Sequence, residues 1–154
     1  MSRRERRYVL DTNLFIRSFR EPDANRALEV FHRLFAPFEY MCAVVAQELR
    51  AGVRTPADRR RLERHVLGPY ERRGRIITPS KRSWNESGDV LAKLAQREGL
   101  DVSRVSKAFG NDVLLALCCR EHGMVLVSEN RRDFERIGAV ARLEVVDPWP
   151  RPVR

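Results

Sequence analysis

Short apolar runs alternate along this chain with segments whose apolar residues recur every three or four positions, and this alternation limits the possible folds more than any other feature. The runs have the composition of buried β-strands, whereas the intervening segments have the period of amphipathic helices. Repeated strand and helix units favour a mostly parallel sheet of about five strands, covered by helices on both faces. The expected strands are RYVLD (7–11), EYMCAVV (39–45), RIITP (75–79), MVLVSEN (124–130) and ARLEVVD (141–147).

The intervening segments predict the helices. Proline at the start of one segment, serine before another and glycine after it are typical helix boundaries. Two segments have an expected apolar face, which consists of Ala27, Val30, Phe31, Leu34 and Phe35 in the first and of Trp84, Val90, Leu91 and Leu94 in the second. The expected helices are 12–19, 23–36, 46–53, 56–74, 80–98, 107–122 and 131–138.

Length and charge narrow the function classes. A chain of 154 residues with 43% hydrophobic content fits one domain over 1–154 and can bury its own core. The formal net charge of +9 favours an anionic partner, either nucleic acid or an acidic protein. Composition cannot choose between those partners, and a solvated basic surface without a ligand remains the alternative.

The cysteines and the absence of long apolar runs bear on location. Cys42, Cys118 and Cys119 lack metal-ligand spacing and are expected to be small core residues in a reducing cytoplasm. No apolar run approaches the ~20 residues that span a bilayer, and the basic residues 1–7 lead into no apolar signal segment. We expect a cytoplasmic protein without a membrane segment.

Three acidic residues stand at positions suited to chemistry. Asp11 follows the first expected strand, and ligands of parallel sheets bind at the carboxyl ends of the strands. Glu48 lies in the helix after the second strand, and Asp112 stands beside the apolar run VLLALCC. Each also has an ordinary explanation: Asp11 could cap the following helix, Glu48 could be a solvated helix residue, and Asp112 could complement a helix dipole.

Carboxylates gathered at one edge of a sheet would repel each other unless a cation joined them. The segment SENRRDF offers Ser128, Glu129, Asn130 and Asp133 as further oxygen donors, although it could be an ordinary polar loop. Oxygen donors of this kind suit Mg²⁺, with Mn²⁺ as the nearest substitute. The three histidines lack the spacing of a zinc hydrolase site.

At these residues the chain resembles the PIN-domain ribonucleases, and among them the toxins of bacterial VapBC-type toxin–antitoxin pairs. The resemblance rests on DTN at 11–13, on an ELxxG-like segment that begins at Glu48, and on Asp112 in its apolar helix. SENRRDF is similar to the late TxNxxDF segment, but Asn130 stands where a fourth acid is common, and DPW at 147–149 is similar to an NPW ending. The implied fold is a three-layer α/β/α PIN-like domain.

The resemblance implies a magnesium-dependent endoribonuclease that acts as a toxin, forms a homodimer and is bound by a cognate antitoxin. The metal ligands would be Asp11, Glu48 and Asp112. Asn130 or Asp133 would fill the fourth position. Thr12, Asn13 and Ser128 are the expected supporting donors. Because a carboxylate cluster repels RNA, positive charge is needed as well, and Arg131 and Arg132, which lie closest to the expected site in the sequence, are the expected ligands for RNA phosphates.

Several alternatives stay open at this point. One or two metal ions could act, and the RNA could be a transfer, ribosomal or messenger RNA. A catalytically silent PIN-like module that binds RNA or a protein is the main competing hypothesis, with Asn130 as a sign of lost activity. A DNA nuclease of related fold is the third possibility.

Overall fold

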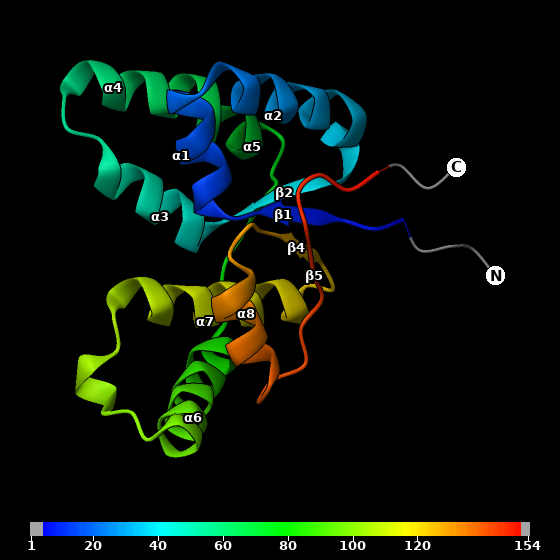
Figure 1. Cartoon of the computed structure of the whole chain (residues 1–154). Coiled ribbons are helices and arrows are strands. Elements are labelled where there is room, and N and C mark those ends of the chain that lie inside the picture. Colours follow the sequence, from blue (N-terminus) through cyan, green and yellow to red (C-terminus); the bar gives the residue numbers. More distant parts are fainter. Residues whose placement is uncertain (1–4, 152–154) are drawn as a thin grey trace.

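A five-stranded parallel sheet forms the centre of the molecule in the computed structural model, which describes residues 5–151 (Figure 1). Residues 1–4, and with them part of the basic stretch considered above as a leader, lie outside the described residues. The strand order is β3-β2-β1-β4-β5, and all neighbours pair in parallel. The strands are β1 (Tyr8–Leu10), β2 (Glu39–Cys42), β3 (Ile76–Ile77), β4 (Val125–Val127) and β5 (Val145–Val146).

The strand order places a switch point beside β1. The chain builds outward from β1 through β2 to β3 and then returns to lay β4 on the other side of β1. The following connections therefore diverge from the carboxyl ends of β1 and β4, and such crevices are where open α/β sheets bind ligands. Asp11 follows β1 directly, and Ser128 follows β4 directly.

Helices cover both faces of the sheet, which confirms the predicted three-layer α/β/α arrangement. Figure 1 shows α1, α2, α4 and α5 on one side of the sheet and α6, α7 and α8 on the other. The helices are α1 (Thr12–Arg20), α2 (Pro22–Phe35), α3 (Ala43–Gly52), α4 (Pro56–Arg61), α5 (Gly68–Arg72), α6 (Lys81–Glu98), α7 (Lys107–Glu121) and α8 (Arg131–Gly138), with 3₁₀ turns η1 (Ala36–Phe38) and η3 (Val102–Arg104) and a π-helical stretch η2 (Leu62–Leu67).

Helix α7 is the central helix of its layer. All residues from Val113 to Cys119 are buried, because the helix packs against the sheet on one side and against α6 on another. Cys118 and Cys119 lie in this run, and Cys42 is buried as well, so the cysteines are core residues as predicted. A helix that is buried almost all round carries no amphipathic period, yet it places Asp112 at the boundary between core and solvent.

Local signals explain where several elements begin and end. Ser80 caps α6 by accepting a hydrogen bond from the backbone N–H of Ser83, and Gly99 ends that helix in a left-handed conformation with a φ of 65°. Both boundaries agree with the sequence prediction. The predicted helix over 56–74 begins at Pro56, but it changes from an α-helix to the wider π-helix η2. The reason is Pro69, which has no N–H to donate and whose ring would clash with the carbonyl four residues earlier in a regular α-helix.

Some predicted boundaries and faces were wrong. The strand expected over 39–45 ends at Cys42, and residues 43–45 begin α3 instead. On α2, Val30 is 46% exposed and Leu34 is 53% exposed, and on α6 Trp84 is 60% exposed. The buried stripe of α2 is narrower than its apolar composition suggests and consists of Leu28, Phe31 and Phe35.

Among residues 5–151, no helix is both long enough and apolar enough to cross a membrane.

Candidate active site

Asp11 is a buried carboxylate that links the first strand to the first helix. It follows β1, it is the N-cap of α1, and only 2% of its surface is exposed. One carboxylate oxygen accepts the backbone N–H of Thr12 at 2.8 Å, and the other accepts the Ser128 hydroxyl at 2.6 Å. Burial raises the pKa of Asp11 above its usual range, although these two hydrogen bonds oppose the shift. Asp11 therefore caps α1, and its carboxylate is at the same time shielded from water at the switch point of the sheet.

Glu48 is linked to Asp11 through Thr12, the first residue of α1. The Thr12 hydroxyl donates to Glu48 Oε1 at 2.9 Å, which ties α3 to the start of α1. Burial raises the pKa of Glu48, hydrogen bonds from Thr12 and Asn111 lower it, and the nearby charge of Asp11 raises it again. Glu48 is thus not simply a solvated helix residue.

Asp112 is the most strongly perturbed of the three acids. It lies in the second turn of α7, and its pKa is raised from 3.8 to about 8 by burial and then by the charges of Asp11, Glu48 and Asp133. The Asn130 side-chain amide donates to Asp112 Oδ2 at 3.2 Å. Burial and the neighbouring carboxylates together disfavour the charged form of Asp112, and perturbed pKa values of this kind are frequent at functional sites.

Asn130 connects the end of β4 to α8. Its backbone N–H donates to the Ser128 hydroxyl oxygen at 3.0 Å, and its side-chain amide also donates to Asp133 Oδ2 at 3.2 Å. Asp133 in turn accepts from Arg136 Nη1 at 3.1 Å. Ser128 therefore bridges Asp11 on one side and Asn130 on the other.

The structure places three sequence-predicted acids, Asp11, Glu48 and Asp112, near one another at the carboxyl edge of the sheet. Side-chain hydrogen bonds link Glu48 to Thr12, Asp11 to Ser128, and Asn130 to both Asp112 and Asp133. The charge of Asp11 helps to raise the pKa values of Glu48 and Asp112, and the charge of Glu48 helps to raise the pKa of Asp112.

The donor chemistry of this cluster fits a hard divalent cation. All of its acidic donors are oxygens, and a cation would offset both the burial and the mutual repulsion that raise the pKa values of Glu48 and Asp112. Within the described part of the chain, however, no three His, Cys, Asp or Glu side chains are already arranged around one metal position. The residues that could hold an ion are Asp11, Glu48 and Asp112, and they would have to draw together to do so.

Other predicted site residues lie outside the chain of hydrogen bonds. Asn13 is exposed in the first turn of α1 and, among the described residues, makes no side-chain hydrogen bond to the cluster. Arg131 forms an ion pair with Asp147, with its Nε at 2.7 Å from Oδ1. Arg132 is exposed at the start of α8.

The sequence reading missed two residues of α7 that act on Glu48. The side chain of Asn111 and the positive charge of Lys107 both lower the pKa of Glu48. Lys107 and Asn111 are four residues apart, so they share one face of the helix. In the sequence, Asn111 stands directly before Asp112, and Lys107 stands five residues before it. This closeness to a predicted site residue is the signal that could have identified them.

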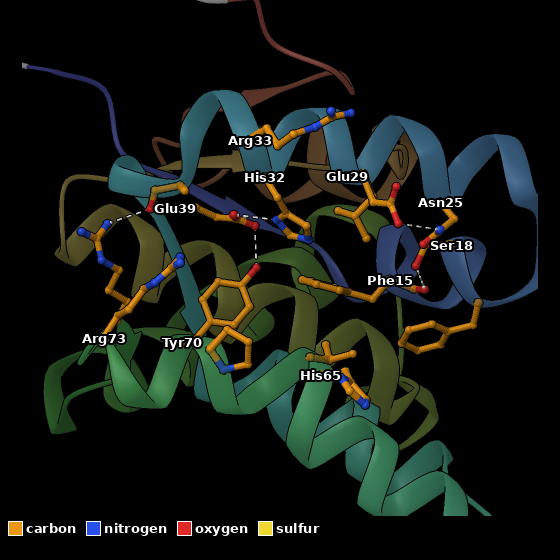
Figure 2. A pocket seen from close by; sticks show the side chains of 16 residues that line it. Phe15, Ser18, Asn25, Glu29, His32, Arg33, Glu39, His65, Tyr70 and Arg73 are labelled. Atoms are coloured by element: carbon orange, nitrogen blue, oxygen red, sulfur yellow. Dashed lines mark hydrogen bonds and ion pairs between the residues drawn. The ribbon is translucent and has the colours of Figure 1, made fainter.

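A separate cavity of about 640 Å³ lies at the opposite end of β2 (Figure 2). It is lined by α1, α2 and the segment from η2 to Arg75, and Glu39 at the start of β2 is buried in its wall. Glu39 accepts from the Tyr70 hydroxyl at 2.5 Å and contacts His32 Nδ1 at 2.7 Å, as Figure 2 shows. Because none of Asp11, Glu48 or Asp112 lines this cavity, it is distinct from the carboxylate cluster.

Several solved structures share this fold. A chain in the crystal structure of FitAcB from Neisseria gonorrhoeae is 20% identical, with a TM-score of 0.66 over 92% of this chain and 98% of that one. A chain of DNA-bound VapBC from Salmonella typhimurium is 21% identical, with a TM-score of 0.67 over the same shares. For VapBC2 from Rickettsia felis, bound to a promoter DNA fragment, the identity is 22% and the TM-score 0.63, over 93% of this chain and 98% of that one.

At these identities the likeness establishes the fold. Among curated proteins, no sequence is significantly similar to the chain. The model of the PIN domain family matches residues 8–140, which span β1 through α8 and include every acidic residue of the cluster. The match covers well over half of the sequence, and the chain therefore belongs to the PIN domain family.

Proposed function

We propose that this protein is a metal-dependent endoribonuclease and the toxin of a type II toxin–antitoxin pair. The observation that carries the proposal is the group of three perturbed carboxylates at the switch point of a PIN-domain sheet. The similar solved structures are toxin–antitoxin complexes, which supports the toxin assignment. Asp11, Glu48 and Asp112 would hold a divalent cation, Mg²⁺ first and Mn²⁺ as a substitute.

The chemistry follows from the oxygen donors. A bound divalent ion would polarise a phosphodiester and supply a water of lowered pKa for in-line attack. The chain itself fixes the acids: the Ser128 hydroxyl and the Thr12 N–H hold Asp11, the Thr12 hydroxyl holds Glu48, and the Asn130 amide holds Asp112. These contacts keep the carboxylate oxygens from rotating away when the site is filled.

RNA phosphates require positive charge near an acidic cluster. Arg132 is exposed in the first turn of α8, two residues after Asn130, and Lys107 is close enough to affect the pKa of Glu48. Arg131 would have to exchange its contact with Asp147 for a phosphate before it could contribute. The net charge of +9 adds long-range attraction for a polyanion.

The proposed partners follow from the same cluster. A cognate antitoxin could neutralise the carboxylates with an arginine, since a guanidinium binds carboxylates through charge-assisted hydrogen bonds. A homodimer and a cytoplasmic location complete the proposal, and three free buried cysteines suit a reducing compartment.

The test compares binding and cleavage on matched RNA and DNA substrates. Asp11→Asn should abolish Mg²⁺-dependent RNA cleavage and leave RNA binding within a few-fold of wild type. Asp89→Asn, which changes an exposed acid on α6, is the matched control and should cleave normally. RNA binding without cleavage by the wild-type chain would support the silent module instead, and selective cleavage of DNA would support a DNA nuclease.

A further inference from the structure

Asn130 stands where the resemblance to PIN-domain ribonucleases places a fourth acid, and its contacts use both ends of its amide. The side-chain nitrogen lies 3.2 Å from Asp112 Oδ2 and 3.2 Å from Asp133 Oδ2. The side-chain oxygen accepts the backbone N–H of Asp133 at 3.5 Å and thereby caps α8. An NH₂ group has two hydrogens to donate, so both carboxylates can be satisfied at once.

These partners also fix which way the amide points. An ionised carboxylate only accepts hydrogen bonds, and Asp133 is paired with Arg136, so the group of Asn130 that faces Asp133 must be the nitrogen. The backbone N–H of Asp133 needs an acceptor, which places the oxygen on the other side. The side chain therefore presents hydrogens, and not a metal-binding oxygen, to Asp112.

Asp133 has its own cation. Its Oδ1 accepts from Arg136 Nη1 at 3.1 Å, and Arg136 is held in place by Glu98 at 2.7 Å and by the ring of Phe109, whose centroid lies 4.4 Å from the guanidinium carbon. Asp133 is thus neutralised by a neighbour on its own helix. Of the acids near the cluster, Asp11, Glu48 and Asp112 have no such ion pair among the described residues.

We propose that Asn130 limits the site to one divalent ion per chain, because it holds Asp112 with an amide hydrogen where a fourth carboxylate would offer ligands to a second ion. This inference rests on the proposed metal-dependent function. Three carboxylates can surround one Mg²⁺, which usually takes one or two of them together with water. A second ion at the Asn130 side would meet an NH₂ group and a carboxylate already paired with Arg136.

The test counts bound Mn²⁺ by electron paramagnetic resonance and measures its affinity by calorimetry on the purified full chain. Wild type should bind one Mn²⁺, and Asn130→Asp should bind a second. Asn130→Ala should still bind one ion, but about tenfold more weakly, because the support of Asp112 is lost. Asp89→Asn, which removes an exposed acid on α6, is the matched control, and it should bind one ion with unchanged affinity.

Two Mn²⁺ ions on the wild-type chain, or none, would overturn the proposal, and so would a single ion on a folded Asn130→Asp variant. Circular dichroism checks that each variant is folded. If Asn130→Asp does not fold, the wild-type count and the affinity of Asn130→Ala still decide. Failure of the proposed function is seen separately: a chain that binds one ion but cleaves no RNA would refute the nuclease and leave the role of Asn130 standing.

Discussion

Replacing Asp112 by asparagine should stabilise the metal-free protein, and the gain should grow with pH. Asp112 has a folded-state pKa of about 8 against an ordinary value of 3.8, because burial and three neighbouring carboxylates disfavour its charge. Below pH 4 the group is protonated in both the folded and the unfolded chain and costs nothing. As the pH rises toward 8, the unfolded chain ionises first, so folding is increasingly penalised. Asparagine carries no charge at any pH and escapes this penalty.

The magnitude follows from that difference in proton affinity. At about 1.4 kcal/mol for each factor of ten, the full shift would correspond to roughly 6 kcal/mol. Water reaches part of the Asp112 side chain and screens the repulsion, so we expect about 2 kcal/mol above pH 8 and close to zero near pH 4. For a chain of this length, 2 kcal/mol raises the melting temperature by about 4–8 °C.

The assay is thermal and urea unfolding of wild type and Asp112→Asn in EDTA across this pH range, with Asp89→Asn as the control for loss of an exposed acid. Added Mg²⁺ should stabilise wild type and narrow or reverse the gap, because an ion relieves the same repulsion. A variant that is no more stable than wild type at high pH, or whose advantage does not change with pH, would refute the reasoning.

Three further substitutions test individual contacts. Tyr70→Phe removes a donor from the buried carboxylate of Glu39 and should lower the unfolding free energy by about 1–3 kcal/mol in urea titrations, while a preserved midpoint would contradict that contact. Thr12→Val removes the hydroxyl that holds Glu48 and should slow RNA cleavage about tenfold, whereas Thr12→Ser should restore it; equal rates for both variants would count against the positioning role. Lys107→Ala should weaken RNA binding and flatten its dependence on salt by about one counterion, and an unchanged slope would place Lys107 outside the RNA interface.

The architecture could be predicted from the sequence because strands and helices have different patterns of apolar residues. Parallel strands that are buried on both faces read as continuous apolar runs, and β1 and β4 are entirely buried. The same property hid the boundary after Cys42: Val44 and Val45 are buried at the start of α3, so the apolar run continues without a change where strand becomes helix. The spacing of apolar residues on α2 also could not show that Val30 and Leu34 face solvent. The apolar residues cover more of the helix surface than the core contacts, and the sequence does not show which of them are left outside.

At the candidate site, the sequence indicated which acids could meet but not how they are held. Asp11, Glu48 and Asp112 could be selected because Asp11 follows a strand, Glu48 lies in the helix after the next strand, and Asp112 stands beside an apolar helical run. The hydrogen bond from Thr12 to Glu48 and the double donation from Asn130 depend on side-chain directions that only the folded chain fixes. Asn130 looked like a lost ligand in the sequence, whereas its contacts make it a donor to two carboxylates.

The central claim is that these carboxylates carry metal-dependent cleavage of RNA. The most direct measurement incubates total cellular RNA with the purified chain, freed of any bound partner, in Mg²⁺ and in EDTA, beside Asp11→Asn. The account predicts discrete fragments with wild type and Mg²⁺ alone, and intact RNA in EDTA and with the variant. Intact RNA under every condition, despite demonstrated RNA binding and bound metal, would contradict it.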